Sequence, residues 1–153
     1  MDAALTARRR AIRSLLDEAR VIAVVGISSK PWRPSYSVAA YLQESGYRIV
    51  PVNPHETEVL GERAYASLLD VPSDLKIDVV DVFRRAEQTP EVARDAVTVG
   101  ARLLWLQEGI VSEEAGRIAT EGGLDVIMGV CIMKVRERLI AEEEAEVEEG
   151  GQG

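Results

Sequence analysis

Short apolar runs alternate with segments of helical periodicity along most of the chain. The runs predict strands buried on both faces of a sheet, and they lie at residues 21–25, 48–52, 77–83, 102–106 and 124–128. Segments with apolar residues on one face predict helices at residues 6–19, 35–45, 89–99, 112–121 and from 132 onward, with a turn and a short helix within 61–71. Because connections of helical length separate the strands, we expect an α/β fold: a doubly wound, five-stranded parallel sheet with helices on both faces, in three layers.

The length and composition are those of one ordinary globular domain. The 153 residues are 46% apolar and 29% charged, and no stretch reaches 18 apolar residues, so no transmembrane helix is expected. The N-terminal residues lack the apolar run of a secretory signal, and a single cysteine, Cys131, excludes an intrachain disulfide. We therefore expect a cytoplasmic protein.

The net charge of −8 comes mostly from the C-terminal end. Residues 139–153 hold six glutamates and no Lys or Arg, which leaves a net charge of −2 on residues 1–138. We expect a single domain over residues 1–140, followed by an acidic helix end and a disordered tail over residues 141–153. Neither part carries the excess of positive charge that would attract nucleic acid or an anionic membrane. We therefore expect no nucleic-acid partner and no membrane partner.

Candidate binding residues follow the strands, because ligands of such sheets bind beyond the carboxyl ends of the strands, where the strand order reverses. The first such loop, residues 26–34, leads into a helix and carries the hydroxyls and cations that bind phosphate. Its candidate residues are Gly26, Ser28, Ser29, Lys30 and Arg33, with Ser35, Tyr36 and Ser37 at the start of the helix. The favoured interpretation is a site for a phosphate-bearing ligand, and the alternative is a serine-capped helix with two solvated cations.

The same loop argues against two common nucleotide sites. A G-x-G-x-x-G fingerprint would need glycines where Ser28 and Pro31 stand, and Asn53 replaces the acidic residue that binds an NAD ribose after the second strand. No G-K-S or G-K-T follows Gly26, as a Walker A loop would require. NAD binding and NTP hydrolysis are therefore disfavoured.

Residues near the ends of the later strands leave alternatives open. Phe83 and Arg84 either contact a ligand or are a core ring and a surface cation, and Gln107 either contacts a ligand or loop backbone or belongs to the core. Cys131 precedes a helix, where a thiol can become reactive, but a lone cysteine is more often a small buried residue. Asp81, within the third strand, is expected to bond to loop backbone. No catalytic or metal-ligating residue is assigned.

Short motifs lie at or just after the expected strand ends: VVGIS at 24–28, KP at 30–31, RPSY at 33–36, VNP at 52–54, VFR at 82–84, LWLQEG at 104–109 and CIM at 131–133. In this order they resemble a family of small stand-alone CoA-binding proteins, which is related to the CoA-binding domain of succinyl-CoA synthetase alpha subunits. The resemblance covers residues 8–140, and it departs from the family at Ile27, where the family often has Ala.

The resemblance implies a Rossmann-like domain with coenzyme A lying across the carboxyl edge of the sheet. It implies that the CoA phosphates lie near Lys30, Arg33 and Ser35, and that the nucleotide end passes residues 52–54. Beyond those of the first loop, the residues that it implies as CoA contacts are Val52, Asn53, Pro54, Phe83, Arg84, Gln107, Gly109 and Cys131.

Three functions remain open. The resemblance favours a non-catalytic CoA or acyl-CoA binding protein, a carrier or sensor. A second function is the CoA-binding subunit of an acyl-CoA ligase or transferase that needs a partner chain. The synthetases use a second domain with a phosphorylated histidine, whereas the only histidine here, His55, is interpreted as a surface residue. The third is a Rossmann-type NAD(P)-binding protein. Each is compatible with a homodimer or another protein partner.

Overall fold

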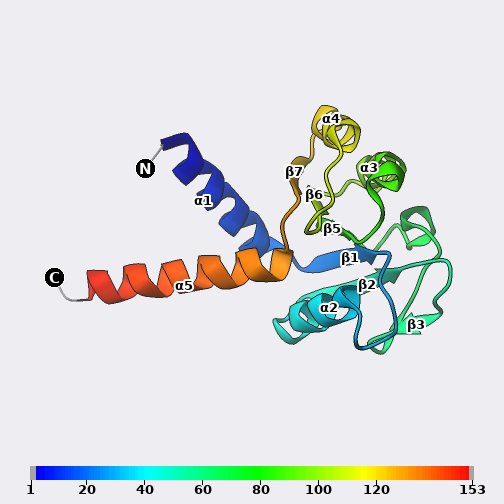
Figure 1. Ribbon diagram of the computed structural model, residues 1–153, viewed down its shortest axis with the longest axis horizontal. Coiled ribbons are helices and arrows are strands. Elements are labelled where there is room, and N and C mark those ends of the chain that lie inside the picture. Colours follow the sequence, from blue (N-terminus) through cyan, green and yellow to red (C-terminus); the bar gives the residue numbers. More distant parts are fainter. Residues whose placement is uncertain (1–2, 152–153) are drawn as a thin grey trace.

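A parallel sheet of five strands forms the centre of the molecule, in the spatial order β2-β1-β5-β6-β7 (Figure 1). The computed structural model describes residues 3–151. The strands are β1 (Val21–Val25), β2 (Arg48–Val52), β5 (Val79–Val82), β6 (Leu103–Leu106) and β7 (Asp125–Met128). All pairings between them are parallel, which confirms the predicted α/β doubly wound architecture.

Helices cover both faces of the sheet. They are α1 (Ala3–Glu18), α2 (Pro34–Glu44), α3 (Thr89–Thr98), α4 (Glu113–Glu121) and α5 (Ile132–Gly150), with 3₁₀ turns at Leu68–Asp70 and Ala86–Gln88. A short antiparallel pair, β3 (Glu58–Val59) and β4 (Glu62–Arg63), follows β2. Buried side chains of α1, α2 and α5 form one core layer, and those of α3 and α4 form the other.

The alternation of side chains along β1 shows why the strands read as continuous apolar runs. Ile22 and Val24 enter the core layer under α1, α2 and α5, whereas Val21, Ala23 and Val25 enter the layer under α3 and α4. Every residue of β1 is buried. A strand buried on both faces has apolar side chains at every position instead of alternating with polar ones, and β-branched residues fit its pleated surface.

The strand order reverses at β1, which is where the candidate binding residues begin. The chain leaves β1 for β2 on one side and then crosses back to β5 on the other. Gly26 donates its N–H to the Val52 carbonyl (2.8 Å), and Phe83 donates its N–H to the Val25 carbonyl (2.8 Å). Gly26 has a φ of +87°, and a Cβ there would collide with the carbonyl oxygen of Phe83. Three segments of the chain therefore meet at a point where only glycine fits.

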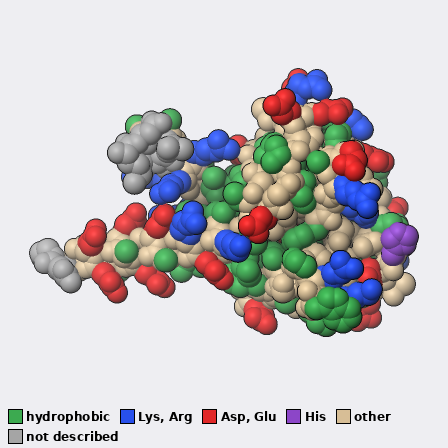
Figure 2. All heavy atoms as spheres, viewed as in Figure 1, with side chains coloured by type: hydrophobic (Ala, Val, Ile, Leu, Met, Phe, Trp, Pro, Cys, Tyr) green, Lys and Arg blue, Asp and Glu red, His purple; other side chains and the backbone are tan. Residues whose placement is uncertain are grey.

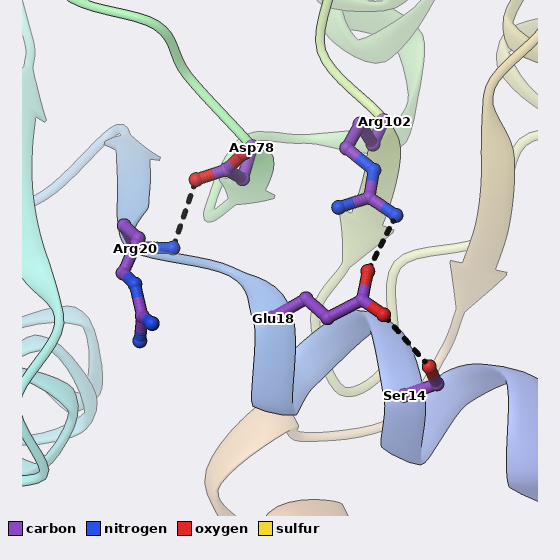
Figure 3. Close-up of polar contacts among 5 residues, drawn as sticks. All are labelled: Ser14, Glu18, Arg20, Asp78 and Arg102. Atoms are coloured by element: carbon purple, nitrogen blue, oxygen red, sulfur yellow. Dashed lines mark hydrogen bonds and ion pairs between the residues drawn. The ribbon is translucent and has the colours of Figure 1, made fainter.

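At the amino edge of the sheet, two acidic side chains attach α1 to the strands (Figure 3). The Asp78 carboxylate accepts hydrogen bonds from the backbone N–H groups of Arg20 (2.8 Å) and Val21 (3.0 Å). Glu18 pairs with Arg102 (3.1 Å) and accepts from the Ser14 hydroxyl (3.3 Å). Asp78 thus precedes β5, rather than lying within the third strand as predicted, and it fixes the turn between α1 and β1.

Asp81 is the exception to the apolar interior. It is fully buried, and its register neighbours Val24 and Trp105 belong to the core layer under α1, α2 and α5. Neither carboxylate oxygen has a hydrogen-bond partner among the described residues, so the expected bond to loop backbone is wrong; Asp78 makes such a bond instead. Burial raises the pKa of Asp81 well above its usual value, because the charged form loses its hydration.

Helices α1 and α5 project beyond the sheet at one end of the molecule (Figure 1). Basic side chains gather along α1 and acidic ones along α5 (Figure 2), and Arg13 lies within 4 Å of both Glu143 and Glu146. Helix α5 continues to Gly150, so most of the segment expected to be a helix end and a tail is helical. None of the described helices is both long and apolar enough to cross a membrane.

The crowding at Gly26 predicts an unusually damaging substitution. Gly26→Ala should lower the free energy of unfolding by more than about 2 kcal/mol, since it adds a steric collision to the cost of a positive φ. Gly109→Ala is the matched control, because Gly109 also has a positive φ (+80°) but has open space where the Cβ would stand. Urea denaturation of both variants measures the difference, and equal losses would contradict the collision.

Asp81 predicts a pH-dependent stability. A pKa raised by folding means that the folded state holds the proton more tightly, so the contribution of Asp81 to stability is full below the unfolded pKa of about 3.9 and is lost as pH rises through the folded pKa. Asp81→Asn does not titrate. As pH rises from 4 to 8, wild type should therefore lose stability that Asp81→Asn keeps. The free energy of unfolding of the variant minus that of wild type, measured by denaturant titration, should increase over this range. A difference that stays constant over this range would contradict the raised pKa.

Candidate functional site

The loop after β1 is folded by its own serines. The Ser35 hydroxyl oxygen accepts the N–H of Ser28 (3.0 Å), and the Ser28 hydroxyl oxygen accepts the N–H of Lys30 (3.1 Å). Ser37, predicted as a further donor, gives its hydroxyl proton to the Pro34 carbonyl (3.2 Å). Ser28 and Ser35 each accept through oxygen and so keep a hydroxyl proton to donate. The hydrogen bonds of these serines fix the conformation of the loop, and the hydroxyls of Ser28 and Ser35 can still donate to an anion.

A second segment, residues 53–56, is bound to this loop from the side of β2. The Asn53 amide donates to the Ile27 carbonyl (2.8 Å), and its oxygen accepts the N–H of His55 (2.9 Å). The Glu56 carboxylate accepts from both the N–H (3.1 Å) and the hydroxyl (3.0 Å) of Ser29. Asn53 therefore joins the ends of β1 and β2, in the position where a dinucleotide site would carry an acid.

The cations of the loop are open to solvent. Lys30 and Arg33 are both exposed, and the ammonium of Lys30 lies 6.0 Å from the centre of the Trp32 ring. Trp32 itself is 76% exposed. Arg33 is the residue before α2, and its side chain makes no capping bond there. Because nothing buries these charges, they can turn toward an anionic ligand at little cost.

A cavity of about 230 Å³ opens beside the loop, between the carboxyl ends of β1 and β2 and the helix α3. Its lining residues are Val25, Val52, Pro54, Ala66, Ser67, Leu68, Arg84, Gln88, Glu91, Val92 and Asp95. The strand ends and Leu68 provide an apolar floor. Arg84 and the polar face of α3 provide a wall with hydrogen-bonding groups.

The wall formed by α3 carries negative charge. Glu91 and Asp95 lie one helical turn apart, and Asp95 is only partly exposed. Burial raises the pKa of Asp95, the nearby Glu91 charge raises it further, and Arg94 lowers it. This wall favours hydrogen-bond donors over phosphate groups.

The structure separates the predicted site residues into two groups. Val52, Pro54 and Arg84 line the cavity, and the first loop continues from Val25 at its edge. Phe83 instead packs against the opposite core layer, beneath α2 and α5, together with part of Tyr36. Phe83 and Arg84, although adjacent in the sequence, therefore contact different sides of the sheet.

The remaining predicted site residues lie further along the carboxyl edge of the sheet. Gln107 and Gly109 follow β6, two strands from β1, and Cys131 follows β7, three strands from β1. The buried Gln107 side chain accepts the N–H of Ile132 (3.1 Å), which supplies a partner at the start of α5. Cys131 is buried as the residue that precedes α5. Gly109 is exposed in the turn after β6. Gln107 thus contacts the backbone at the start of α5.

Sequence reasoning missed most of the residues that line the cavity. Ser67 and Leu68 come from the long connection between β2 and β5, Gln88 directly precedes α3, and Glu91 and Asp95 come from α3. For Ser67 and Leu68 the available signal was the length of that connection, because long connections at the surface of a compact domain often carry functional residues. The contact between Ser29 and Glu56 has no comparable signal, since the two residues are 27 positions apart.

Comparisons with known proteins agree on one family. The model of a CoA binding domain matches residues 20–137. YneT of Bacillus subtilis, an uncharacterised protein, is 45% identical over 121 residues, which are 79% of this chain and 88% of YneT. A solved protein of Pyrococcus horikoshii superposes with a TM-score of 0.82 and 41% identity, covering 86% of this chain and 92% of that one.

A third relative is the alpha subunit of the ADP-forming acetate–CoA ligase II of Pyrococcus furiosus. It is 30% identical over 122 residues, which are 74% of this chain but only 27% of the subunit. The match thus corresponds to one part of a larger enzyme chain. With a family model over residues 20–137 and the Rossmann-like sheet in place, the chain belongs to the family of CoA binding domains.

Proposed function

We propose that this protein binds coenzyme A, free or acylated, at the carboxyl edge of its sheet, and that it acts as a carrier or sensor without catalysing a reaction on its own. The observation that carries the proposal is the pairing of an apolar cavity with an adjacent loop rich in anion-binding groups. CoA combines an adenine ring with phosphate groups, so it needs both kinds of surface. Membership in the family supports the same ligand.

The cavity suits the adenine end of CoA. Its volume of about 230 Å³ lies below the ~300–1,000 Å³ of sites that enclose whole ligands, so it fits one portion of CoA. Val25, Val52 and Leu68 offer an apolar floor for a ring. Gln88 and Asp95 offer oxygens that would accept the N–H groups of the adenine amino group.

The phosphates belong at the first loop for an electrostatic reason. Glu91 and Asp95 repel phosphate from the α3 wall, whereas Lys30 and Arg33 on the other side attract it. The free hydroxyl protons of Ser28 and Ser35 add neutral donors there. Arg84, which lines the cavity and lies beside Gly26, supplies a cation between the two regions.

A second candidate function is the CoA-binding part of an acyl-CoA ligase that a partner chain completes. The similarity to a segment covering 27% of the acetate–CoA ligase alpha subunit favours it. In that case the cavity and loop would have the same ligand, and the partner would supply the reacting groups. Co-purification of the chain with a second subunit under native conditions distinguishes this function from a free carrier.

The ligand assignment predicts a selective stabilisation. CoA at saturating concentration should raise the melting temperature, because a ligand that binds only the folded state stabilises it by RT ln(1 + [L]/Kd). NAD at the same concentration should leave it unchanged, since Ser28, Pro31 and Asn53 occupy the positions that the dinucleotide fingerprint needs. A thermal-shift series with CoA, acetyl-CoA, NAD, NADP and ATP makes the comparison. A larger shift with NAD would reverse the assignment.

The placement of the phosphates predicts which cations matter. Lys30→Ala and Arg33→Ala should each weaken CoA binding about tenfold or more, because a hydrogen bond to a charged group contributes ~1.5–3 kcal/mol. Arg48→Ala removes the same charge at the opposite edge of the sheet, where β2 begins, and should bind like wild type. Isothermal titration calorimetry gives the three dissociation constants. Unchanged binding by both loop variants would contradict the placement.

A further inference from the structure

We propose that Glu56 sets the ligand affinity of this site by competing with the ligand's phosphates for the first loop. The proposal rests on the proposed function, because it assumes that an anionic ligand reaches Ser29. In the structure, one carboxylate oxygen of Glu56 accepts two hydrogen bonds from Ser29, one from its N–H (3.1 Å) and one from its hydroxyl (3.0 Å). An acid thus occupies donors that a phosphate oxygen would use.

The contact has the geometry of an anion site. A backbone N–H and a hydroxyl converge here on one carboxylate oxygen, and hydrogen bonds to a charged acceptor are stronger than neutral ones. A phosphate oxygen makes the same two bonds. A carboxylate and a phosphate at the same donors would repel each other, so binding of the phosphate requires Glu56 to leave.

The surrounding bonds let the side chain leave while the backbone stays. Residues 53–56 are fixed to the first loop by Asn53, whose amide donates to Ile27, and the Glu56 N–H donates to the Asn53 carbonyl (3.2 Å). None of these bonds uses the Glu56 carboxylate. Among residues 3–151, Glu56 also has no basic group within 4.0 Å as an ion-pair partner. Rotation of one half-exposed side chain therefore exposes both donors of Ser29.

A different role for Glu56 makes the opposite prediction. In dinucleotide sites an acid after the second strand accepts hydrogen bonds from ribose hydroxyls. If Glu56 served CoA in that way, loss of its charge would weaken binding. If it competes with phosphate, loss of its charge strengthens binding.

The test is isothermal titration calorimetry of CoA against wild type, Glu56→Gln and Glu58→Gln at low ionic strength. Gln keeps an oxygen that can accept from Ser29 but forms only neutral hydrogen bonds, so Glu56→Gln should bind CoA roughly three- to tenfold more tightly. Glu58→Gln removes the same charge from an exposed residue two positions further on, which makes no hydrogen bond to the first loop in the described structure, and it should stay within about twofold of wild type. Equal effects of the two variants, or weaker binding by Glu56→Gln, would overturn the proposal.

ADP as a second ligand separates the two proposals. Tighter ADP binding by Glu56→Gln, with no CoA binding by any of the three proteins, would retain the competition and reject CoA. CoA binding that is the same in wild type and Glu56→Gln would retain CoA and reject the competition. No binding of either ligand to any of the three proteins would overturn both.

Discussion

The close meeting of three chain segments at Gly26 is the constraint on which the site depends. Its N–H bonds to the end of β2, and the preceding Val25 carbonyl accepts the N–H of Phe83 after β5, so both neighbouring strands are fixed against the peptide unit between Val25 and Gly26. No side chain fits between Gly26 and the Phe83 backbone, and Gly26 adopts a positive φ where the chain leaves β1. That turn starts the first loop directly beside the cavity. The loop and the cavity are thus positioned by one point of backbone packing rather than by flexible side chains.

Charge then divides the edge of the sheet into regions with different preferences. Lys30 and Arg33 make the first loop suitable for anions, whereas Glu91 and Asp95 make the far wall of the cavity suitable for hydrogen-bond donors. Asp81 lies beneath this edge without a hydrogen-bond partner among the described residues, and its raised pKa favours the neutral form. A neutral Asp81 adds no negative charge near the loop to which we assign the ligand's phosphates. The unpaired carboxyl is therefore compatible with an anion site in a way that an ionised one would not be.

The sheet could be predicted from the sequence because its strands carry an unambiguous signal. Five buried runs with β-branched residues, separated by helical segments, leave few other arrangements. The side-chain partners could not be predicted in the same way. Asp78 and Asp81 lie in one apolar run, yet Asp78 bonds to backbone and Asp81 has no hydrogen-bond partner among the described residues. The difference arises because β5 begins at Val79, so that Asp78 precedes the strand and Asp81 lies within it. Likewise, the part of the cavity formed by Ser67 and α3 depends on how a long connection returns to the sheet.

The first turns of helix α5 make its contacts with the carboxyl edge of the sheet and with α2. Gln107 accepts the N–H of Ile132 at the carboxyl edge, and Arg136 donates to Tyr41 (2.9 Å) on α2, the helix that continues from the first loop. Beyond that point α5 meets α1 through ion pairs such as that of Arg9 with Glu142 (3.5 Å), and exposed pairs contribute little stability. The match to the CoA binding domain ends at residue 137, between Arg136, which contacts α2, and Glu142, which pairs with α1. The distal half of α5 can therefore vary in sequence without disturbing the loop, whereas a change at Arg136 would reach it through α2.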